Sequence, residues 1–288
     1  MADASRGQAG GQDGGNEAFP PPAGFEEVTY LGVRVARLDA ASAAACTAAR
    51  PADAPYVYVV TPNAAHFTLL NLSDDARFRD AYDHAWMRLL DGQVPRALAR
   101  LLFGLDLPHA AGSDVALLLL ERHIGPDDPV TLIGGSPEVP RRLAERFGLR
   151  HIAHHNPPMG FINRPDEVAA CVDFVLANPA RFVFFGVGTP QGEYLAREVA
   201  LRGGATGCGL CVGGALNFAT GITQRAPAFV RKAGLEWAHR LVRNPAGHAR
   251  RVFVDSLPVV WIALKARLNP AAYGMGRVPA DGGAKDRA

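Results

Sequence analysis

The stretch from Arg181 to Glu193, RFVFFGVGTPQGE, constrains the fold of this chain more than any other. Its first part, Phe182–Phe185, is aromatic or β-branched and too short for a lone helix, so it predicts a buried strand. Glycines follow in Gly186–Pro190, and a helical pattern begins near Gln191. A strand, a glycine turn and a helix together present a ligand at the carboxyl edge of a parallel sheet, where glycines let the backbone approach a phosphate. A tight turn without a ligand is the alternative, because a short Gly-x-Gly is a weak signal.

The same alternation runs through most of the chain. Further strands are predicted at Tyr56–Val60, Trp86–Leu90, Val130–Ile133, Leu149–Ala153 and Ala205–Val212, with a hairpin before them at Val28–Leu38. Stretches of helical period separate these strands. Strands that alternate with helices are typical of an α/β fold with a mainly parallel sheet and helices on both faces.

Small or polar residues follow most of the predicted strands. They are Thr61-Pro62-Asn63, Asp91-Gly92, Gly134-Gly135-Ser136, Gly186-Val187-Gly188 and Gly213-Gly214. Ligands of such sheets bind outside the carboxyl ends of the strands, so several polar strand ends together indicate a binding site more strongly than any one of them.

The two ends of the chain differ from the α/β core, which we assign to residues 25–224. Residues 1–24 hold almost no large apolar side chains and predict a disordered tail, as do residues 269–288. Between Arg225 and Arg267, nine Lys or Arg residues and two acids alternate with Trp, Phe and Leu. This pattern suits an anionic membrane surface, so we assign residues 225–268 to a basic amphipathic helical appendage. Ordinary helices that close the domain are the alternative.

Composition limits the remaining possibilities. The net charge of +2 over 288 residues argues against a nucleic-acid partner. The four cysteines show no regular framework, which favours a reducing compartment. Neither a signal peptide nor a long apolar span is evident, so we expect a cytoplasmic protein. Whether it forms a homo-oligomer is left open.

Seven motifs occur in the order found in the WecG/TagA/CpsF glycosyltransferases, which the chain resembles over roughly residues 28–255. The motifs are Thr61-Pro62-Asn63, Leu90-Asp91-Gly92, Gly112-Ser113-Asp114, Pro157-Pro158-Met159-Gly160-Phe161, Gly186-Val187-Gly188-Thr189-Pro190 with Glu193, Arg225-Ala226-Pro227, and Gly234-Leu235-Glu236-Trp237 with Arg240. The resemblance implies a Rossmann-like fold and an inverting bacterial enzyme without a required metal or cofactor.

The resemblance also implies the substrates. The donor would be a UDP-sugar carrying N-acetylmannosamine, its uronate, glucose or glucuronate. The acceptor would be a polyprenyl-diphosphate-linked saccharide at the inner face of the cytoplasmic membrane, where the enzyme would bind peripherally. The product would enter a cell-surface polysaccharide or exopolysaccharide.

Inverting transfer requires a base for the acceptor hydroxyl and donors or cations for the departing diphosphate. Asp91 matches the catalytic aspartate of the family, with an ordinary Asp-Gly turn as the alternative. Thr61 and Asn63 would bind the sugar or the base, unless they cap the next helix. We group His109 with these substrate-binding candidates.

Further candidates would bind the nucleotide and its diphosphate. Gly186, Gly188, Pro190, Gln191 and Glu193 form the predicted nucleotide site. Glu193 would reach the ribose or the base, unless it is a plain exposed helix glutamate. Arginine suits phosphate because its guanidinium donates two hydrogen bonds and stays charged. Four tail arginines would contact the diphosphate, with a solvated basic face as the alternative: Arg225, Arg240, Arg250 and Arg251.

Two positions depart from the family pattern. Gly192 stands where the family usually has glutamine, and His109 stands where it tends to have arginine. A neutral histidine is a poorer phosphate partner than arginine. The departures indicate a different donor sugar, a rebuilt pocket or reduced activity.

Two other functions stay open at this point. The Gly-x-Gly sequence invites a nicotinamide-dependent (NAD) oxidoreductase, although the full dinucleotide fingerprint is missing. The departures at Gly192 and His109 also fit a non-catalytic, membrane-associated assembly factor on the same fold.

Overall fold

One parallel sheet of six strands organises the protein, which is seen here in a computed structural model that describes residues 25–223, 254 and 256–276. The strand order is β4-β3-β8-β7-β5-β6, and every neighbouring pair is parallel. The strands are β3 (Val57–Val60), β4 (Met87–Arg88), β5 (Val130–Ile133), β6 (Ile152–His155), β7 (Phe182–Phe185) and β8 (Cys208–Cys211). The predicted α/β class with a Rossmann-like parallel sheet is therefore confirmed.

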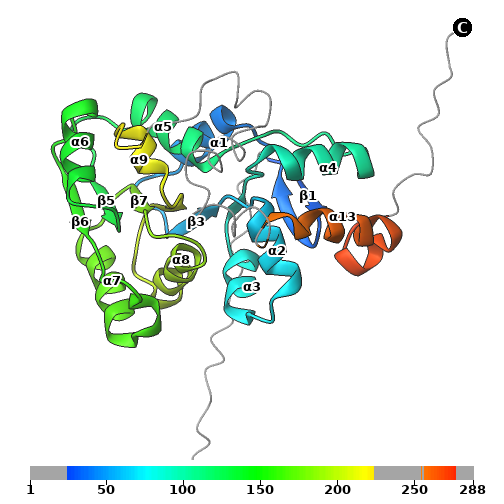
Figure 1. Cartoon of the computed structure of the whole chain (residues 1–288). Helices are drawn as coiled ribbons and strands as arrows, with labels where there is room; N and C mark the ends of the chain where they lie inside the picture. Colours follow the sequence, from blue (N-terminus) through cyan, green and yellow to red (C-terminus); the bar gives the residue numbers. More distant parts are fainter. Residues whose placement is uncertain (1–24, 224–253, 255, 277–288) are drawn as a thin grey trace, which may run out of the picture.

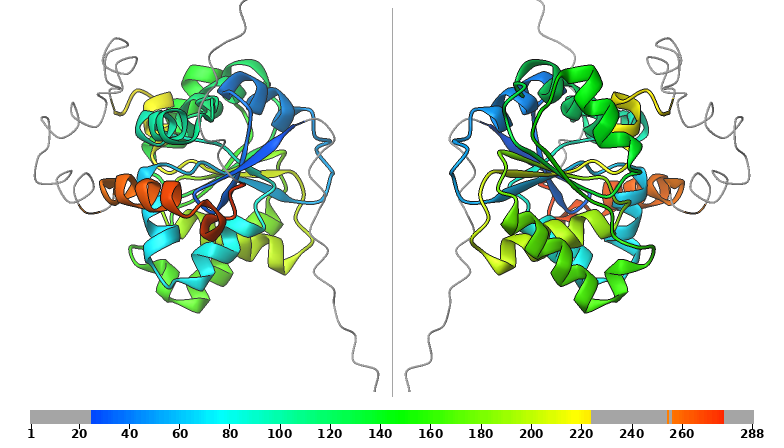
Figure 2. Two further views of the ribbon diagram at one scale, coloured as in Figure 1. Left: turned by 90° about the vertical axis from the view of Figure 1, so that its right-hand side faces the viewer. Right: turned by 90° about the vertical axis from the view of Figure 1, so that its left-hand side faces the viewer.

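Helices cover both faces of this sheet (Figures 1 and 2). One face carries α1 (Ala40–Ala48), α5 (Gly112–Arg122), α6 (Glu138–Phe147) and α9 (Ala215–Ala219). The other carries α2 (Ala64–Leu72), α3 (Ala76–Asp83), α4 (Gln93–Phe103), η1 (Phe161–Asn163), α7 (Pro165–Ala177), α8 (Gln191–Arg202) and α13 (Pro258–Leu268). In β7, Phe182 and Phe184 pack into the first layer, while Val183 and Phe185 pack into the second. Because both faces are covered, β7 is apolar at every position rather than at alternate ones.

The predicted hairpin is present as β1 (Glu27–Tyr30) paired antiparallel with β2 (Val33–Ala36), and it lies against the β4 edge of the sheet. The buried guanidinium of Arg88, on β4, connects the hairpin to the sheet. It donates to the backbone oxygen of Arg34 over 2.7 Å and pairs with Glu27 over 2.7 Å. A buried charge is tolerated when it is paired and hydrogen-bonded, so this contact holds β4 firmly just before Asp91.

The sequence misplaced the strand β6. We predicted Leu149–Ala153, but β6 spans Ile152–His155 because the register with β5 pairs Ile152 with Val130 and His155 with Ile133. As an edge strand, β6 is only half-buried, so it accommodates the polar His154 and His155. Its position is therefore set by backbone pairing with β5 more than by local hydrophobicity. The predicted strand at Trp86–Leu90 is also shorter, since only Met87 and Arg88 pair with β3.

The C-terminal helix α13 packs against α2 and α4 and buries Val259, Ile262 and Ala266. A 3-10 turn, η3 (Pro270–Tyr273), follows, and Met275 is buried. The folded part of the chain thus continues to residue 276, into the stretch from 269 that we predicted to be a disordered tail. The structure does not describe residues 1–24, 224–253, 255 and 277–288.

Candidate active site

Asp91 lies at the carboxyl edge of the sheet, in the turn between β4 and α4. Its backbone N–H donates to the carbonyl oxygen of Pro62 over 2.9 Å, so the turns after β3 and β4 are hydrogen-bonded to each other. Gly92, the next residue, has a φ of 93°, which L side chains rarely adopt. The sharp turn at Gly92 therefore presents Asp91 directly before the first turn of α4.

The Asp91 carboxylate is partly open to solvent and has an imidazole beside it. Its side chain is 29% exposed, and Nε2 of His109 lies 3.8 Å from Oδ1 of Asp91. The N–H of Ala110 donates to the carbonyl oxygen of Leu90 over 2.9 Å, which holds the loop before α5 against the end of β4. The structure thus brings together Asp91 and His109, which the sequence assigned to separate tasks.

Thr61 and Asn63 adjoin this site, and both side chains make contacts that stabilise the fold. Thr61 is buried at 7% exposure, and a Cβ at Gly112 would lie 2.9 Å from its Oγ1, so the start of α5 packs on it. Oδ1 of Asn63 accepts hydrogen bonds from the N–H groups of Ala65 and His66, over 3.0 and 3.4 Å. The capping alternative is therefore correct for this oxygen, while the side-chain Nδ2 of Asn63, which is a donor, cannot cap the N–H groups of the helix.

A pocket of about 500 Å³ opens at the ends of β5, β6 and β7. We call it the carboxyl-edge pocket, and its volume lies in the range of small-ligand sites. Its wall consists of Gly134, Gly135, Asn156–Phe161, Gly186–Gly188 and Gln191. The predicted residues Gly186, Gly188 and Gln191 line it, and Pro190 lies between them as the cap of α8.

Glycine backbone forms much of this wall. Gly134 has a φ of 89°, and a Cβ on it would lie 2.7 Å from Cγ1 of Val187. The N–H of Gly186 donates to the carbonyl oxygen of Ile133 over 2.7 Å. The turns after β5 and β7 therefore touch, and their backbone approaches the pocket without side chains between. The N-terminus of α8 opens at the same place and favours negative charge.

Glu193 is neither exposed nor part of this wall. It is 3% exposed, its Oε1 accepts a hydrogen bond from the Thr189 hydroxyl over 3.0 Å, and burial raises the pKa of its carboxyl to about 7. Its Oε2 has no hydrogen-bond partner among the described residues. The alternative of an exposed helix glutamate is wrong, since the first turn of α8 faces inward.

Gly192, which departs from the family pattern, packs closely against the loop that precedes it. Its N–H donates to the carbonyl oxygen of Gly188 over 3.1 Å, and a Cβ on it would lie 3.3 Å from the carbonyl oxygen of Val187. Any side chain here would therefore push the loop at the pocket wall by a few tenths of an ångström.

Two residues near the site were missed by sequence reasoning. His66 and Thr189 join the turn after β3 to the turn after β7, with 2.6 Å between Nε2 and Oγ1. One signal could have found His66, because it stands three residues after the cap Asn63, at the spacing of a capping box. Thr189 stands within the Gly186–Pro190 motif, but that motif did not indicate a partner for its hydroxyl.

The four predicted arginines, Arg225, Arg240, Arg250 and Arg251, lie outside the described residues. The part of the wall that the structure describes carries no charged side chain. A diphosphate bound there would therefore depend on backbone N–H groups and on cations from elsewhere in the chain.

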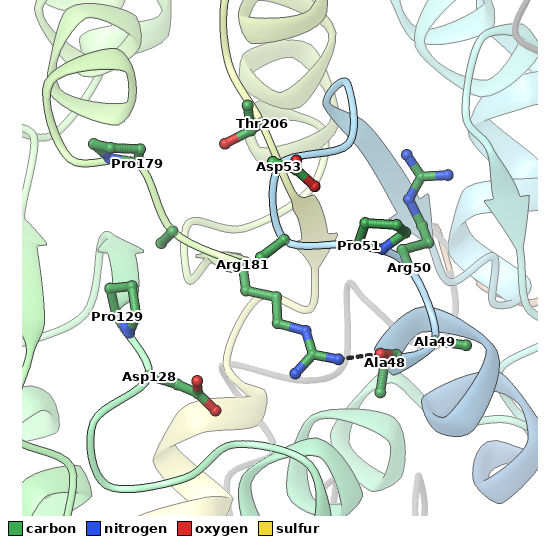
Figure 3. A pocket seen from close by; sticks show the side chains of 12 residues that line it. Ala48, Ala49, Arg50, Pro51, Asp53, Asp128, Pro129, Pro179, Arg181 and Thr206 are labelled. Atoms are coloured by element: carbon green, nitrogen blue, oxygen red, sulfur yellow. Dashed lines mark hydrogen bonds between the residues drawn. The ribbon is translucent and has the colours of Figure 1, made fainter.

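A second pocket, of about 580 Å³, lies at the opposite edge of the sheet (Figure 3). Its wall includes Arg50, Asp53, Asp128 and Arg181. The guanidinium of Arg181 crosses it and donates to the carbonyl oxygen of Ala48 in the last turn of α1. This arginine stabilises a helix C-terminus. Because parallel α/β sheets bind ligands at their carboxyl edge, the carboxyl-edge pocket is the better candidate for the active site.

A glycine-walled pocket and a partly exposed carboxylate at the same carboxyl edge are typical of α/β enzymes that bind nucleotides. The chain matches the model of the Glycosyl transferase WecG/TagA/CpsF family over residues 28–273, and it belongs to this family. The protein is therefore a glycosyltransferase, as its motifs predicted, and the oxidoreductase alternative loses its support. Within the described ranges, none of the helices combines the length and apolar character needed to cross a membrane.

Proposed function

We propose that this enzyme transfers a hexose-type sugar, with inversion, from a UDP-sugar to a polyprenyl-diphosphate-linked saccharide during bacterial cell-surface polysaccharide synthesis. The observation that carries the proposal is the Asp91 carboxylate, which is held by backbone contacts and partly open to solvent at the same edge of the sheet as the carboxyl-edge pocket. Membership of the glycosyltransferase family supports the reaction class.

Asp91 would act as the general base. The acceptor hydroxyl gives its proton to the carboxylate while its oxygen forms a bond to the anomeric carbon of the donor sugar. The bond from that carbon to the diphosphate breaks, and UDP leaves with the electron pair. His109, 3.8 Å away, would hold the carboxylate in the orientation that receives the proton.

The sheet geometry suggests how the donor lies. Three strand spacings separate β4 from β7, which is roughly 14 Å at the usual distance between strands. With its nucleotide in the carboxyl-edge pocket, the donor would extend across the ends of β8 and β3 to bring its sugar to Asp91. Glycine N–H groups and the N-terminus of α8 would hold the diphosphate.

The described part of the appendage supports the expected contact with an anionic membrane. The helices α13 and α4 lie side by side (Figure 1). On α13, Trp261 is 59% exposed and Leu268 is 88% exposed, and on α4, Leu101 is 80% exposed. Neither helix contains an acid, whereas together they hold four cations: Arg96, Arg100, Lys265 and Arg267. Exposed apolar groups with cations suit anionic lipid. Because α4 follows Asp91 directly, such an orientation would bring the base near a lipid-linked acceptor.

Calorimetric titration tests the proposal. The full chain is titrated with UDP, UDP-N-acetylmannosamine, UDP-glucose, UDP-glucuronate and NAD, with and without anionic vesicles, and transfer to a polyprenyl-diphosphate-linked acceptor is then assayed. We expect saturable UDP binding, one preferred sugar nucleotide, and transfer that vesicles enhance. NAD binding alone would overturn the proposal. UDP binding without transfer from any of these donors would favour the non-catalytic assembly factor.

A further inference from the structure

A chain of hydrogen bonds joins the two sides of the active site through residues far apart in the sequence. Nε2 of His66, on α2, lies 2.6 Å from Oγ1 of Thr189, in the loop after β7. The Thr189 hydroxyl donates to Oε1 of Glu193, on α8, over 3.0 Å. The His66 ring and Glu193 are buried, at 6% and 3% exposure. These hydrogen bonds therefore connect α2 to α8 through Thr189, and the side chains at both of its bonds are buried.

The backbone of Asn63 determines the tautomer of His66. The Asn63 N–H donates to Nδ1 of His66 over 2.9 Å, so Nδ1 carries no proton. The ring proton is then on Nε2, which donates to Oγ1 of Thr189. Since that oxygen accepts from His66, its own hydrogen points to Glu193. Every donor in this hydrogen-bond chain has an acceptor, and each residue donates to the next one from Asn63 through His66 and Thr189 to Glu193.

Each end of the chain is fixed to a part of the active site. At one end, the turn that holds Asn63 also bonds to Asp91, through the N–H of Asp91 and the carbonyl oxygen of Pro62 at 2.9 Å. Toward the other end, Thr189, which donates to Glu193, belongs to the glycine loop that lines the carboxyl-edge pocket, and the N–H of Gly192 closes that loop by donating to the carbonyl oxygen of Gly188.

We propose that His66 and Thr189, anchored by Glu193, are positioning residues that hold the Asp91 turn at a set distance from the nucleotide-binding glycine loop. The effect on catalysis rests on the proposed function, whereas the hydrogen-bond chain does not. Since a base must reach the acceptor hydroxyl while the nucleotide is held on a different strand, a small shift between the two turns would slow transfer without weakening nucleotide binding.

The residues around His66, Thr189 and Glu193 show which variants test the hydrogen-bond chain without disturbing the core. The His66 ring lies 6.2 Å from that of Phe78 and 6.3 Å from that of Tyr82, so His66→Phe keeps an aromatic ring in this stack. Glu193 also faces the phenol of Tyr82 from α3 and the thiol of Cys211 from β8. Thr189 is exposed as a whole residue, so Thr189→Val removes the hydroxyl with little change in packing.

The first test compares Thr189→Val with Thr189→Ser. The valine variant should lower kcat roughly 10- to 100-fold while the KM for the donor changes less than about twofold, and the serine variant should restore kcat. The matched control is Thr68→Val on α2, whose hydroxyl donates only to its own helix at Ala64. Unchanged kcat in Thr189→Val, or an equal loss in Thr68→Val, would overturn the positioning role.

The second test needs no sugar transfer. Nitrogen NMR of the full chain should show His66 as the Nε2–H tautomer, with its Nε2 resonance shifted in Thr189→Val. Amide hydrogen exchange at Asn63 should accelerate in His66→Phe. An Nδ1–H tautomer would overturn the proposal whatever the activity. So would an Nε2 resonance with the same chemical shift in the wild type and in Thr189→Val. If no donor supports transfer but this NMR pattern is found, the proposed function fails while the hydrogen-bond chain stands.

Discussion

The two halves of the carboxyl edge use different parts of the polypeptide. At the ends of β3 and β4, side chains are presented: Asp91, His109 and the cap Asn63. At the ends of β5 and β7, Gly134 and Gly186 have no side chains, so their backbone itself forms part of the pocket wall. In the function proposed above, this difference would separate two tasks, because proton removal needs a titratable group while a diphosphate is best held by N–H donors. Changes in the first half should therefore affect turnover, and changes in the second half should affect binding and stability.

The largest effect should follow from Asp91→Asn, which removes the base and keeps the shape. We expect kcat/KM to fall roughly 100- to 10,000-fold, the contribution of a positioned general base. UDP affinity and the thermal midpoint should stay close to those of the wild type, since the backbone bond from Asp91 to Pro62 is retained. Initial rates measure kcat/KM, titration calorimetry measures UDP affinity, and thermal denaturation measures the midpoint. The control is Asp127→Asn in the loop before β5, and wild-type rates in Asp91→Asn would refute the assignment of the base.

The glycine half is tested by Gly134→Ala. A left-handed φ and a Cβ 2.7 Å from Val187 should together cost roughly 2–4 kcal/mol of unfolding free energy and weaken UDP binding. Gly148→Ala is the matched control, because Gly148 has a φ of 71° but no atom within 4 Å of its added Cβ. Urea denaturation compares the two. Equal losses would mean that the contact between the β5 and β7 turns contributes nothing beyond backbone strain.

The connection between the halves makes stability depend on pH through Glu193. Burial raises the pKa of this carboxyl from 4.5 to about 7, so between these values the folded state keeps a proton that the unfolded state loses. The contribution of Glu193 to stability therefore falls as pH rises through this window and levels off above pH 7. Relative to the wild type, Glu193→Gln should gain stability between pH 5 and pH 8, by roughly 3 kcal/mol at most. Denaturation of both proteins at each pH measures the gain, with Glu198→Gln at an exposed position of α8 as the control. A constant difference would contradict a buried, neutral carboxyl.

The smallest effect should be at the proposed membrane surface, which adjoins the catalytic half through α4. Leu101→Asn should weaken binding to anionic vesicles by about three- to tenfold, because one exposed leucine contributes a modest part of the apolar contact. Leu201→Asn on α8 is the control, since Leu201 is 55% exposed on a helix that we do not assign to the membrane. Vesicle co-sedimentation measures the difference, and equal affinities of the two variants would show that α4 does not face the lipid.

The glycine half was readable from the sequence, since a strand such as Phe182–Phe185 and the glycines after it carry local signals. An apolar run of four buried residues and a turn that demands positive φ depend on neighbours in the chain. Asp91 was equally accessible, because a polar residue at a strand end in an α/β pattern lies at the carboxyl edge whatever the details of packing.

The catalytic half and its connection to the glycines depended on contacts between distant segments. Glu193 was predicted to reach the nucleotide, with an exposed helix position as the alternative, and only the packing of α8 against the sheet shows that it is buried. His66 and Thr189 are 123 residues apart, so no local pattern pairs them. The shift of β6 to Ile152–His155 likewise came from its register with β5.

The sequence by itself determined the class of fold, the alternation of strands and helices along the chain, the glycosyltransferase family and the edge of the sheet that carries the candidate site. Periodicity, turn residues and motif order are properties of the chain alone. Only the tertiary structure decided which candidates meet: it set His109 beside Asp91, turned Glu193 inward and joined Asn63 to the glycine loop. Strand order, register and burial decide these contacts, and they arise from pairing and packing between segments that the linear sequence keeps far apart.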